Sequence, residues 1–128
     1  MTPPYSGHCL CGSTRFCCTE APLWQSHCHC ESCRRACSSA FTSFFGVADG
    51  AWEWTGAAPA SYASSLGVSR DFCAICGSQM AYRSDRYPGE IHFYAALLDD
   101  PSRYAAENHV HTDEMLPWLH LADALPRR

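Results

Sequence analysis

Residues 9–12 read Cys9-Leu10-Cys11-Gly12, and residues 73–77 read Cys73-Ala74-Ile75-Cys76-Gly77. Two thiols that stand one or two residues apart can both point at one cation when the backbone curls around it. The glycine that ends each stretch is typical of a metal-binding turn, because such a turn often needs a positive φ, which a residue without Cβ adopts freely. The two pairs together offer four sulfurs for one tetrahedral zinc. We expect this zinc to be structural and to join the start of the chain to its middle.

A third cysteine cluster occupies Cys28-His29-Cys30-Glu31-Ser32-Cys33. It has no fourth cysteine in pattern and is followed by two arginines instead of a glycine. Three protein ligands with one exchangeable position are typical of a catalytic zinc, whereas structural zinc sites have four ligands. Three thiolates make the cation a weak Lewis acid that suits a further thiolate better than hydroxide. The spacing therefore predicts a catalytic zinc on Cys28, Cys30 and Cys33, with chemistry in which a bound thiol adds to a carbonyl.

The cysteine spacing is also compatible with other kinds of site. A fourth protein ligand would close the second site and leave two structural zincs; the candidates are His27, His29, Cys37, His109 and His111. A disulfide framework is less favoured, because the N-terminus shows no export signal and the thiols are then expected in a reducing compartment. Iron–sulfur ligation is disfavoured by the cramped C-x-C pairs and by spacings unlike those of ferredoxins.

Composition indicates a globular protein of modest size. The chain has 128 residues, of which 47% are hydrophobic and 17% charged, so we expect one folded domain over residues 1–128. No apolar run approaches the roughly 18 residues of a membrane span. The net charge is −4, and the nine basic residues, all arginine, form no basic block, which argues against a nucleic-acid partner. With no basic or apolar leader, the sequence predicts a cytoplasmic protein.

Short β-type runs separated by turn residues predict a mostly β fold. The expected strands cover residues 13–19, 23–29, 41–48, 51–55, 61–66, 69–72, 79–83 and 91–95, with a further short strand possible at 109–111. One helix is expected from about Glu31 to Cys37, and a turn of helix should follow Asp99-Asp100-Pro101, where proline takes the first helical position. Leu116-Pro117-Trp118-Leu119 is expected to pack against the body of the protein as an apolar anchor.

Several pieces of the chain stand in a recognisable combination. They are Gly7–Gly12 with Phe16, His27–Arg35, Phe72–Gly77, and His109 with Pro117-Trp118 and Leu125-Pro126. Together they resemble the glutathione-dependent formaldehyde-activating enzyme (GFA) family, which also includes centromere protein V. The resemblance covers nearly the whole chain. It departs from the family pattern at Cys37, at His111 and at the additional pair Cys17-Cys18.

The resemblance implies a mostly β domain of several coiled antiparallel sheets with zinc knuckles and one or two short helices, a fold shared with a Rab nucleotide-release chaperone. It implies a structural zinc on the four cysteines of the two glycine-ended pairs and a catalytic zinc on the middle three. The namesake reaction of the family joins formaldehyde to the thiol of glutathione, giving S-hydroxymethylglutathione, and is classed as a carbon–sulfur lyase activity.

Three residues are expected to bind the substrate. Arg34 and Arg35 follow the middle cluster, and an arginine there can form a bidentate pair with a carboxylate of glutathione. The plainer alternative for both arginines is a solvated helix face. His109 is a candidate through the resemblance alone.

Two hypotheses about function follow from the sequence. The first is a zinc-dependent carbon–sulfur lyase-type enzyme that adds glutathione or a similar thiol to formaldehyde or another small aldehyde. The second is a non-catalytic module that binds two zinc ions and contacts a protein partner. Neither hypothesis involves a membrane.

Overall fold

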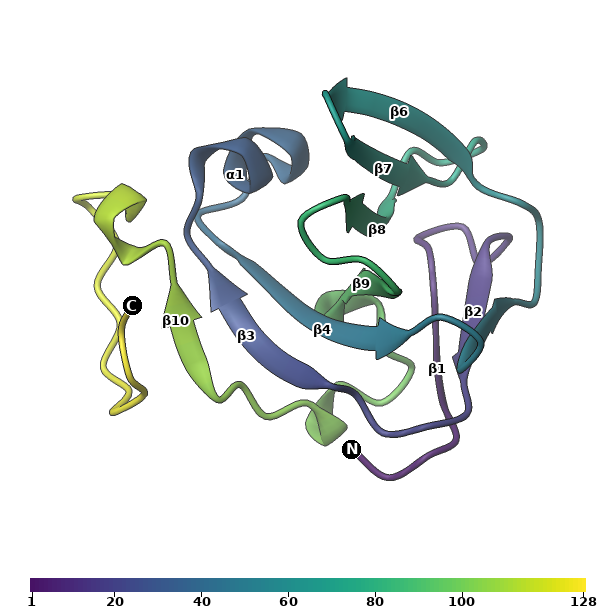
Figure 1. Cartoon of the computed structure of the whole chain (residues 1–128), viewed down its shortest axis with the longest axis horizontal. Helices are drawn as coiled ribbons and strands as arrows, with labels where there is room; N and C mark the ends of the chain where they lie inside the picture. The colour runs from purple at the N-terminus through teal and green to yellow at the C-terminus, as the bar shows by residue number, and fades with distance from the viewer.

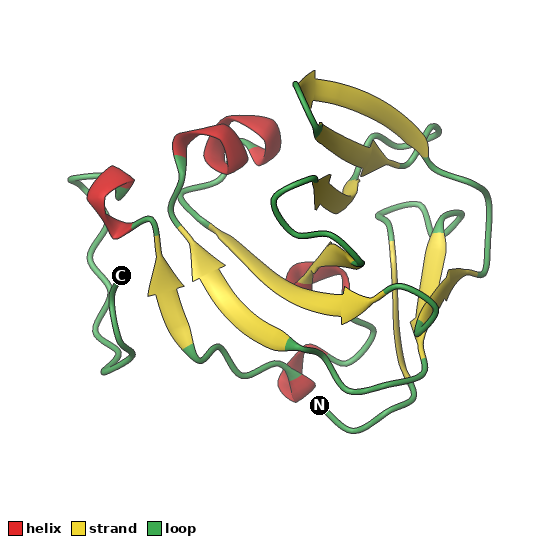
Figure 2. Ribbon diagram, viewed as in Figure 1, coloured by secondary structure: helices red, strands yellow, loops and turns green.

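The computed structural model describes residues 1–128 as two β-sheets with one short α-helix (Figures 1 and 2). The strands are β1 Tyr5–His8, β2 Arg15–Cys18, β3 Trp24–Cys28, β4 Thr42–Ala48, β5 Trp52–Trp54, β6 Ala60–Ser65, β7 Val68–Phe72, β8 Gln79–Ser84, β9 Glu90–Tyr94 and β10 Asn108–Val110. The mostly β fold predicted from the sequence is thereby confirmed, and each of the eight main predicted strands overlaps one of β2 to β9.

The larger sheet has seven strands in the order β10-β3-β4-β9-β8-β7-β6, and the smaller sheet has three in the order β1-β2-β5. All neighbouring strands are antiparallel except β10 and β3, which run parallel. The sequence did not indicate β1, because Tyr5-Ser6-Gly7-His8 is short and contains serine and glycine, which are poor strand formers. In Figure 1 the small sheet stands beside the β6 to β9 end of the large sheet.

The main hydrophobic core lies between the two sheets and is built on aromatic rings. Phe16 of β2, Phe45 of β4 and Phe93 of β9 have no exposed surface. The rings of Phe16 and Phe93 stack with their centroids 4.1 Å apart. Trp52 and Trp54 of β5 meet the ring of Phe93 edge-on at 5.4 and 5.6 Å. Phe93 therefore contacts both sheets and is the central residue of the core.

Helix α1 spans Glu31–Cys37, as the sequence predicted. Cys30 is its N-cap residue, with extended backbone and a side chain that accepts a hydrogen bond from the backbone N–H of Cys33. The helix ends at Ser38, which is left-handed with φ of 52°. Three single turns of 3₁₀ helix follow later in the chain: η1 Ala95–Leu97, η2 Pro101–Arg103 and η3 Thr112–Glu114. None of the helices combines the length and the apolar character needed to span a membrane.

The C-terminal segment runs along the outer edge of the large sheet. The backbone N–H of His109 in β10 donates to Pro126, and the N–H of Arg128 donates back to His109. The expected anchor at residues 116–119 is found only in part: Leu116 and Leu119 are half-buried, whereas 65% of Trp118 is exposed to solvent. No helix or strand follows η3, so no regular element carries the indole into the core.

Replacing Phe93 with alanine tests the role of the aromatic core. We expect Phe93→Ala to lower the free energy of unfolding by about 3–5 kcal/mol, because the substitution removes a buried ring and leaves a cavity. Urea unfolding of the zinc-loaded protein, followed by tryptophan fluorescence, measures the change. Leu66→Ala is the control: Leu66 is fully exposed, and its loss should cost less than about 0.5 kcal/mol.

Candidate metal centres

Four cysteines from two separate turns form the first thiol cluster. Their Sγ atoms all lie within 4.8 Å of one another; the residues are Cys9, Cys11, Cys73 and Cys76. The first pair lies in the turn between β1 and β2, and the second in the turn between β7 and β8. Both turns close on glycines with positive φ, 80° at Gly12 and 81° at Gly77. The geometry brings together the four sulfurs that the sequence predicted would share a cation.

Backbone amides and a hydroxyl group are directed at these sulfurs. The N–H of Thr14 donates to Cys9 Sγ at 3.3 Å, and the N–H of Cys76 donates to Cys73 Sγ at 3.4 Å. Hydrogen bonds from the hydroxyl and the N–H of Ser78 lower the pKa of Cys76 to about 5. Donors of this kind favour thiolate over thiol. A tetrahedral set of four thiolates fits zinc.

The second cluster consists of Cys28, Cys30 and Cys33, whose Sγ atoms also lie within 4.8 Å of one another. Cys28 ends β3, Cys30 caps α1, and Cys33 lies in the first turn of the helix. The N–H of Cys33 donates to Cys30 Sγ at 3.3 Å. Hydrogen bonds from the other two thiols lower the pKa of Cys30. A strand end, a cap and a helical turn thus gather three thiols, which fit a thiophilic cation such as zinc.

Three of the histidines considered as a fourth ligand, which lie in β3, directly after it and in β10, point elsewhere. His27 Nδ1 is hydrogen-bonded to Ser43 Oγ at 2.7 Å. His29 Nε2 lies 2.8 Å from His109 Nδ1, and His109 Nε2 lies 2.9 Å from a carboxylate oxygen of Asp123. His29 and His109 are both fully buried in this chain of contacts. Their hydrogen bonds hold them in a relay beside the cysteines, outside the group of mutually close sulfurs.

The other two candidates also lie outside that group. Cys37, at the end of α1, is half-buried, and burial raises the pKa of its thiol, while a hydrogen bond with Tyr94 opposes the rise. His111 faces the same cavity as the three cysteines, and its Nδ1 lies 3.6 Å from a carboxylate oxygen of Glu114. No ligand atom of another histidine, cysteine or acidic residue therefore belongs to the group in which the three sulfurs lie within 4.8 Å of one another.

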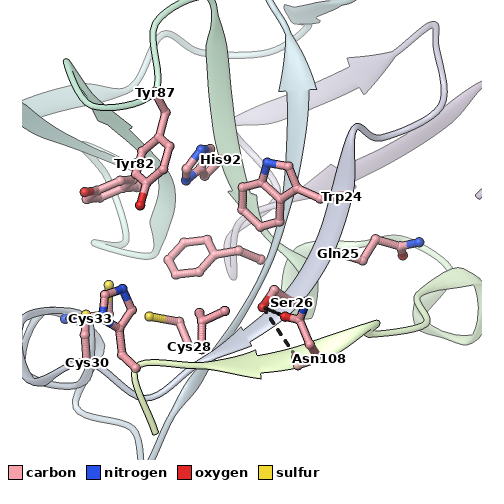
Figure 3. Close-up of a pocket in the computed structure, with 13 residues that line it drawn as sticks. Trp24, Gln25, Ser26, Cys28, Cys30, Cys33, Tyr82, Tyr87, His92 and Asn108 are labelled. Atoms are coloured by element: carbon pink, nitrogen blue, oxygen red, sulfur yellow. Dashed lines mark hydrogen bonds between the residues drawn. The ribbon is translucent and has the colours of Figure 1, made fainter. Parts of the chain in front are cut away.

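The three cysteines open onto a cavity of about 320 Å³ (Figure 3). Aromatic side chains form much of its wall: Trp24 from β3, Phe44 from β4, Tyr82 from β8, and Tyr87 from the turn before β9. Figure 3 shows the cysteines at one end of the cavity, with Tyr82, Tyr87 and His92 facing them from across it and Trp24 at the side. A ligand in the cavity would meet sulfur at one end and aromatic rings around it.

Comparison with known proteins identifies the family. The sequence matches the family described as glutathione-dependent formaldehyde-activating enzyme, GFA, over residues 4–114. The chain belongs to the GFA family. A crystal structure of a Rhodobacter sphaeroides protein matches this GFA chain with a TM-score of 0.63 and 19% sequence identity, covering 77% of this chain and 93% of that one. That likeness concerns the fold. None of the curated proteins matches the sequence.

The substrate-binding residues predicted for this GFA chain do not line the cavity. Arg34 donates to the backbone carbonyls of His29 and Glu114 at 3.4 and 3.2 Å. Arg35 pairs with Glu31 across 3.7 Å on the exposed face of α1. Both arginines border a separate surface hollow with Leu116 and Trp118, and His109 is buried behind β3. A role for these three residues in binding substrate remains a prediction from sequence.

Arg70 of β7 is a residue of the GFA site that sequence reasoning missed. It is 6% exposed, its Nη1 lies 3.8 Å from Cys33 Sγ, and Nη1 also donates to the Tyr94 hydroxyl at 3.5 Å. The guanidinium carbon lies 5.0 Å from the centre of the Tyr82 ring. Three thiolates with one divalent cation carry a net negative charge, which a buried guanidinium offsets. No local signal marks Arg70, because pairing of distant strands brings it to Cys33.

Zinc analysis of cysteine variants tests the two clusters. We expect two zinc ions per chain in the natural protein and one in Cys30→Ser, which should keep its fold with a loss below about 2 kcal/mol. Cys76→Ser should lose more than about 3 kcal/mol, because binding of a structural zinc contributes directly to folding. Metal content and urea unfolding measure both effects. Equally severe unfolding of the two variants would show that both clusters are structural.

A substitution of Arg70 tests the charge compensation. We expect Arg70→Met to weaken zinc binding at the three-cysteine cluster by about 10- to 100-fold, since hydrogen bonds to charged groups contribute about 1.5–3 kcal/mol. Competition with a chromophoric chelator measures the affinity of each cluster separately. The four-cysteine cluster serves as an internal reference for folding, and Arg86→Met, on an exposed turn, is the matched control. Unchanged affinity in Arg70→Met would contradict the proposed charge role.

Proposed function

We propose that this chain is a zinc-dependent enzyme that adds a thiol, such as glutathione, to formaldehyde or another small aldehyde. The observation that carries the proposal is the group of three sulfurs at the end of an aromatic-walled cavity, with no fourth protein donor close to all three. Structural zinc sites are closed by four protein ligands, whereas catalytic sites keep a position for substrate. Membership of the GFA family supports the same reaction class.

The residues of the site have separable roles in this proposal. Cys28, Cys30 and Cys33 would hold the metal at one end of the cavity, and Arg70, beside Cys33, would offset the excess negative charge. Zinc bound there would lower the pKa of a substrate thiol and keep it as a thiolate at neutral pH. The aromatic walls would surround the reacting atoms with apolar surface and reduce their contact with water, which favours addition of the thiol over hydration of the aldehyde.

The net reaction is balanced without an oxidant or reductant. A carbon–sulfur bond forms between the thiol sulfur and the aldehyde carbon, while the carbonyl double bond becomes a single carbon–oxygen bond. The proton that leaves the thiol ends on that oxygen and gives a hydroxyl group. The reverse direction breaks the carbon–sulfur bond and releases the aldehyde, which is the lyase reaction.

We propose a structural role for the other cluster. Its four sulfurs lie in two turns, apart from the residues that line the cavity. A zinc ion held there would contribute folding free energy on the order of 10 kcal/mol, because the unfolded chain cannot present the four ligands together. Loss of this metal should therefore affect stability first and catalysis only through unfolding.

Exchange spectroscopy on the zinc-loaded protein tests the proposal. We expect the chain to accelerate the addition of 2-mercaptoethanol or glutathione to ¹³C-formaldehyde without changing the equilibrium constant. Cys30→Ser should lower the acceleration by about 100-fold or more, since even loss of residues that support metal ligands costs about 10- to 100-fold. Cys37→Ser, which changes a nearby cysteine outside the cluster, is the matched control and should retain activity. A protein that holds two zinc ions yet accelerates neither addition would favour the non-catalytic module.

A further inference from the structure

The cavity beside the three cysteines lacks the positively charged side chains expected of a site that binds glutathione. None of the residues lining it is an arginine, and the chain contains no lysine. Arg70, which does contact the centre, is already engaged with Cys33 and Tyr94 and does not line this cavity. Glutathione carries two carboxylates and a net negative charge. The cavity therefore offers no cationic side chain to pair with them.

The buried histidine of the cavity does not supply a positive charge either. His92 is buried, and burial lowers its pKa, against the opposing effect of Glu90, so its ring is mostly neutral at neutral pH. His111 Nδ1 lies 3.6 Å from a carboxylate oxygen of Glu114, which adds a negative charge beside the cavity. Three thiolates add negative charge at one end. Burying a carboxylate here without a partner is strongly unfavourable.

The aromatic wall is held rigidly in position. Glu90 Oε1 accepts a hydrogen bond from Trp24 Nε1 at 3.1 Å and lies 2.6 Å from His92 Nε2. The Trp24 and His92 rings meet edge-to-face with centroids 4.5 Å apart. Gly46 of β4 lies directly beneath the indole, where a Cβ would collide with it. The wall is thus formed before a ligand arrives, which favours binding of a flat, apolar group.

Polar groups at the side of the cavity away from the tyrosines are neutral. Ser26 donates from its hydroxyl to the side-chain oxygen of Asn108 at 2.6 Å, and Gln25 lies beside it on β3. Figure 3 shows Ser26 and Asn108 linked at this end of the site. An amide and a hydroxyl can accept or donate hydrogen bonds to an uncharged ligand but cannot neutralise a carboxylate. The polar contacts therefore match the uncharged character of the walls.

We propose that the thiol substrate of this site is a small uncharged molecule whose apolar, preferably aromatic, group packs on Trp24 and Tyr82 while its sulfur reaches the three cysteines. This inference rests on the proposed function and narrows its substrate class. By this inference the substrate of this chain differs from glutathione, the thiol of the reaction after which the family is named. Glutathione would bring two carboxylates to a cavity that no arginine or lysine lines. The carbonyl partner has only the small space that remains beside the sulfur.

Absorbance titrations of the cobalt-substituted protein test the substrate class. Thiol binding to cobalt gives a charge-transfer band, so dissociation constants for 2-phenylethanethiol, 2-mercaptoethanol, cysteamine and glutathione can be compared directly. We expect 2-phenylethanethiol to bind at least about tenfold more tightly than glutathione, since it buries an apolar ring and no charge. Trp24→Ala should weaken the binding of 2-phenylethanethiol by about tenfold and the binding of 2-mercaptoethanol by less than about twofold.

Two further variants guard against loss of folding. Trp118→Ala removes an exposed indole that does not line the cavity. It should leave the dissociation constants of 2-phenylethanethiol and 2-mercaptoethanol unchanged. Tyr87 lines the cavity but is 43% exposed, so Tyr87→Ala should fold even if Trp24→Ala does not. This variant should weaken the binding of 2-phenylethanethiol more than the binding of 2-mercaptoethanol. Glutathione or cysteamine binding as tightly as 2-phenylethanethiol would overturn the inference and leave the proposed function standing. If no thiol changes the cobalt spectrum, the proposed function itself is wrong.

Discussion

Four thiol groups drawn from two distant turns form the constraint on which the rest of this structure depends. Cys9 and Cys11 lie in a turn that joins two strands of the small sheet, whereas Cys73 and Cys76 lie in a turn of the large one, and their sulfurs lie within 4.8 Å of one another. Thiolates this close would repel by about 4 kcal/mol per pair at an effective dielectric constant of 20, so a cation bound among them would stabilise the deprotonated cluster. A shared ion would therefore fasten both sheets around the core that Phe93 fills.

Much of this arrangement could be predicted because its signals are local. The cysteine spacings indicated both clusters, and α1 began and ended where the sequence suggested. The predicted strands were found because turn residues separate them. Arg70 and the cavity walls could not be predicted, since they depend on which strands pair across the large sheet. Trp118 was expected inside because it is apolar, yet the irregular segment around it leaves it on the surface.

The open side of the second cluster depends on where the neighbouring imidazoles lie. His27, in β3, and His29, just after the strand, flank Cys28, and the rings of both lie about 5 Å from the ring of His109. The parallel strand β10 supplies His109, and the C-terminal segment supplies Asp123, so hydrogen bonds hold both buried imidazoles. The pairing of β10 with β3 thus affects the chemistry of the site. It holds the imidazoles of His29 and His109 in hydrogen bonds, so that they do not join the three sulfurs as ligands.

The position of the Trp24 indole in the cavity wall depends on Gly46, a residue that does not itself line the cavity. The indole of Trp24 lies against the bare backbone at this position. A methyl group there would overlap the indole and force it to shift, which would change the width of the cavity while the three cysteines stay as they are. Related proteins that differ only at the position of Gly46 would therefore bind substrates of different width. Their substrate range can change while the residues around the reacting atoms stay the same.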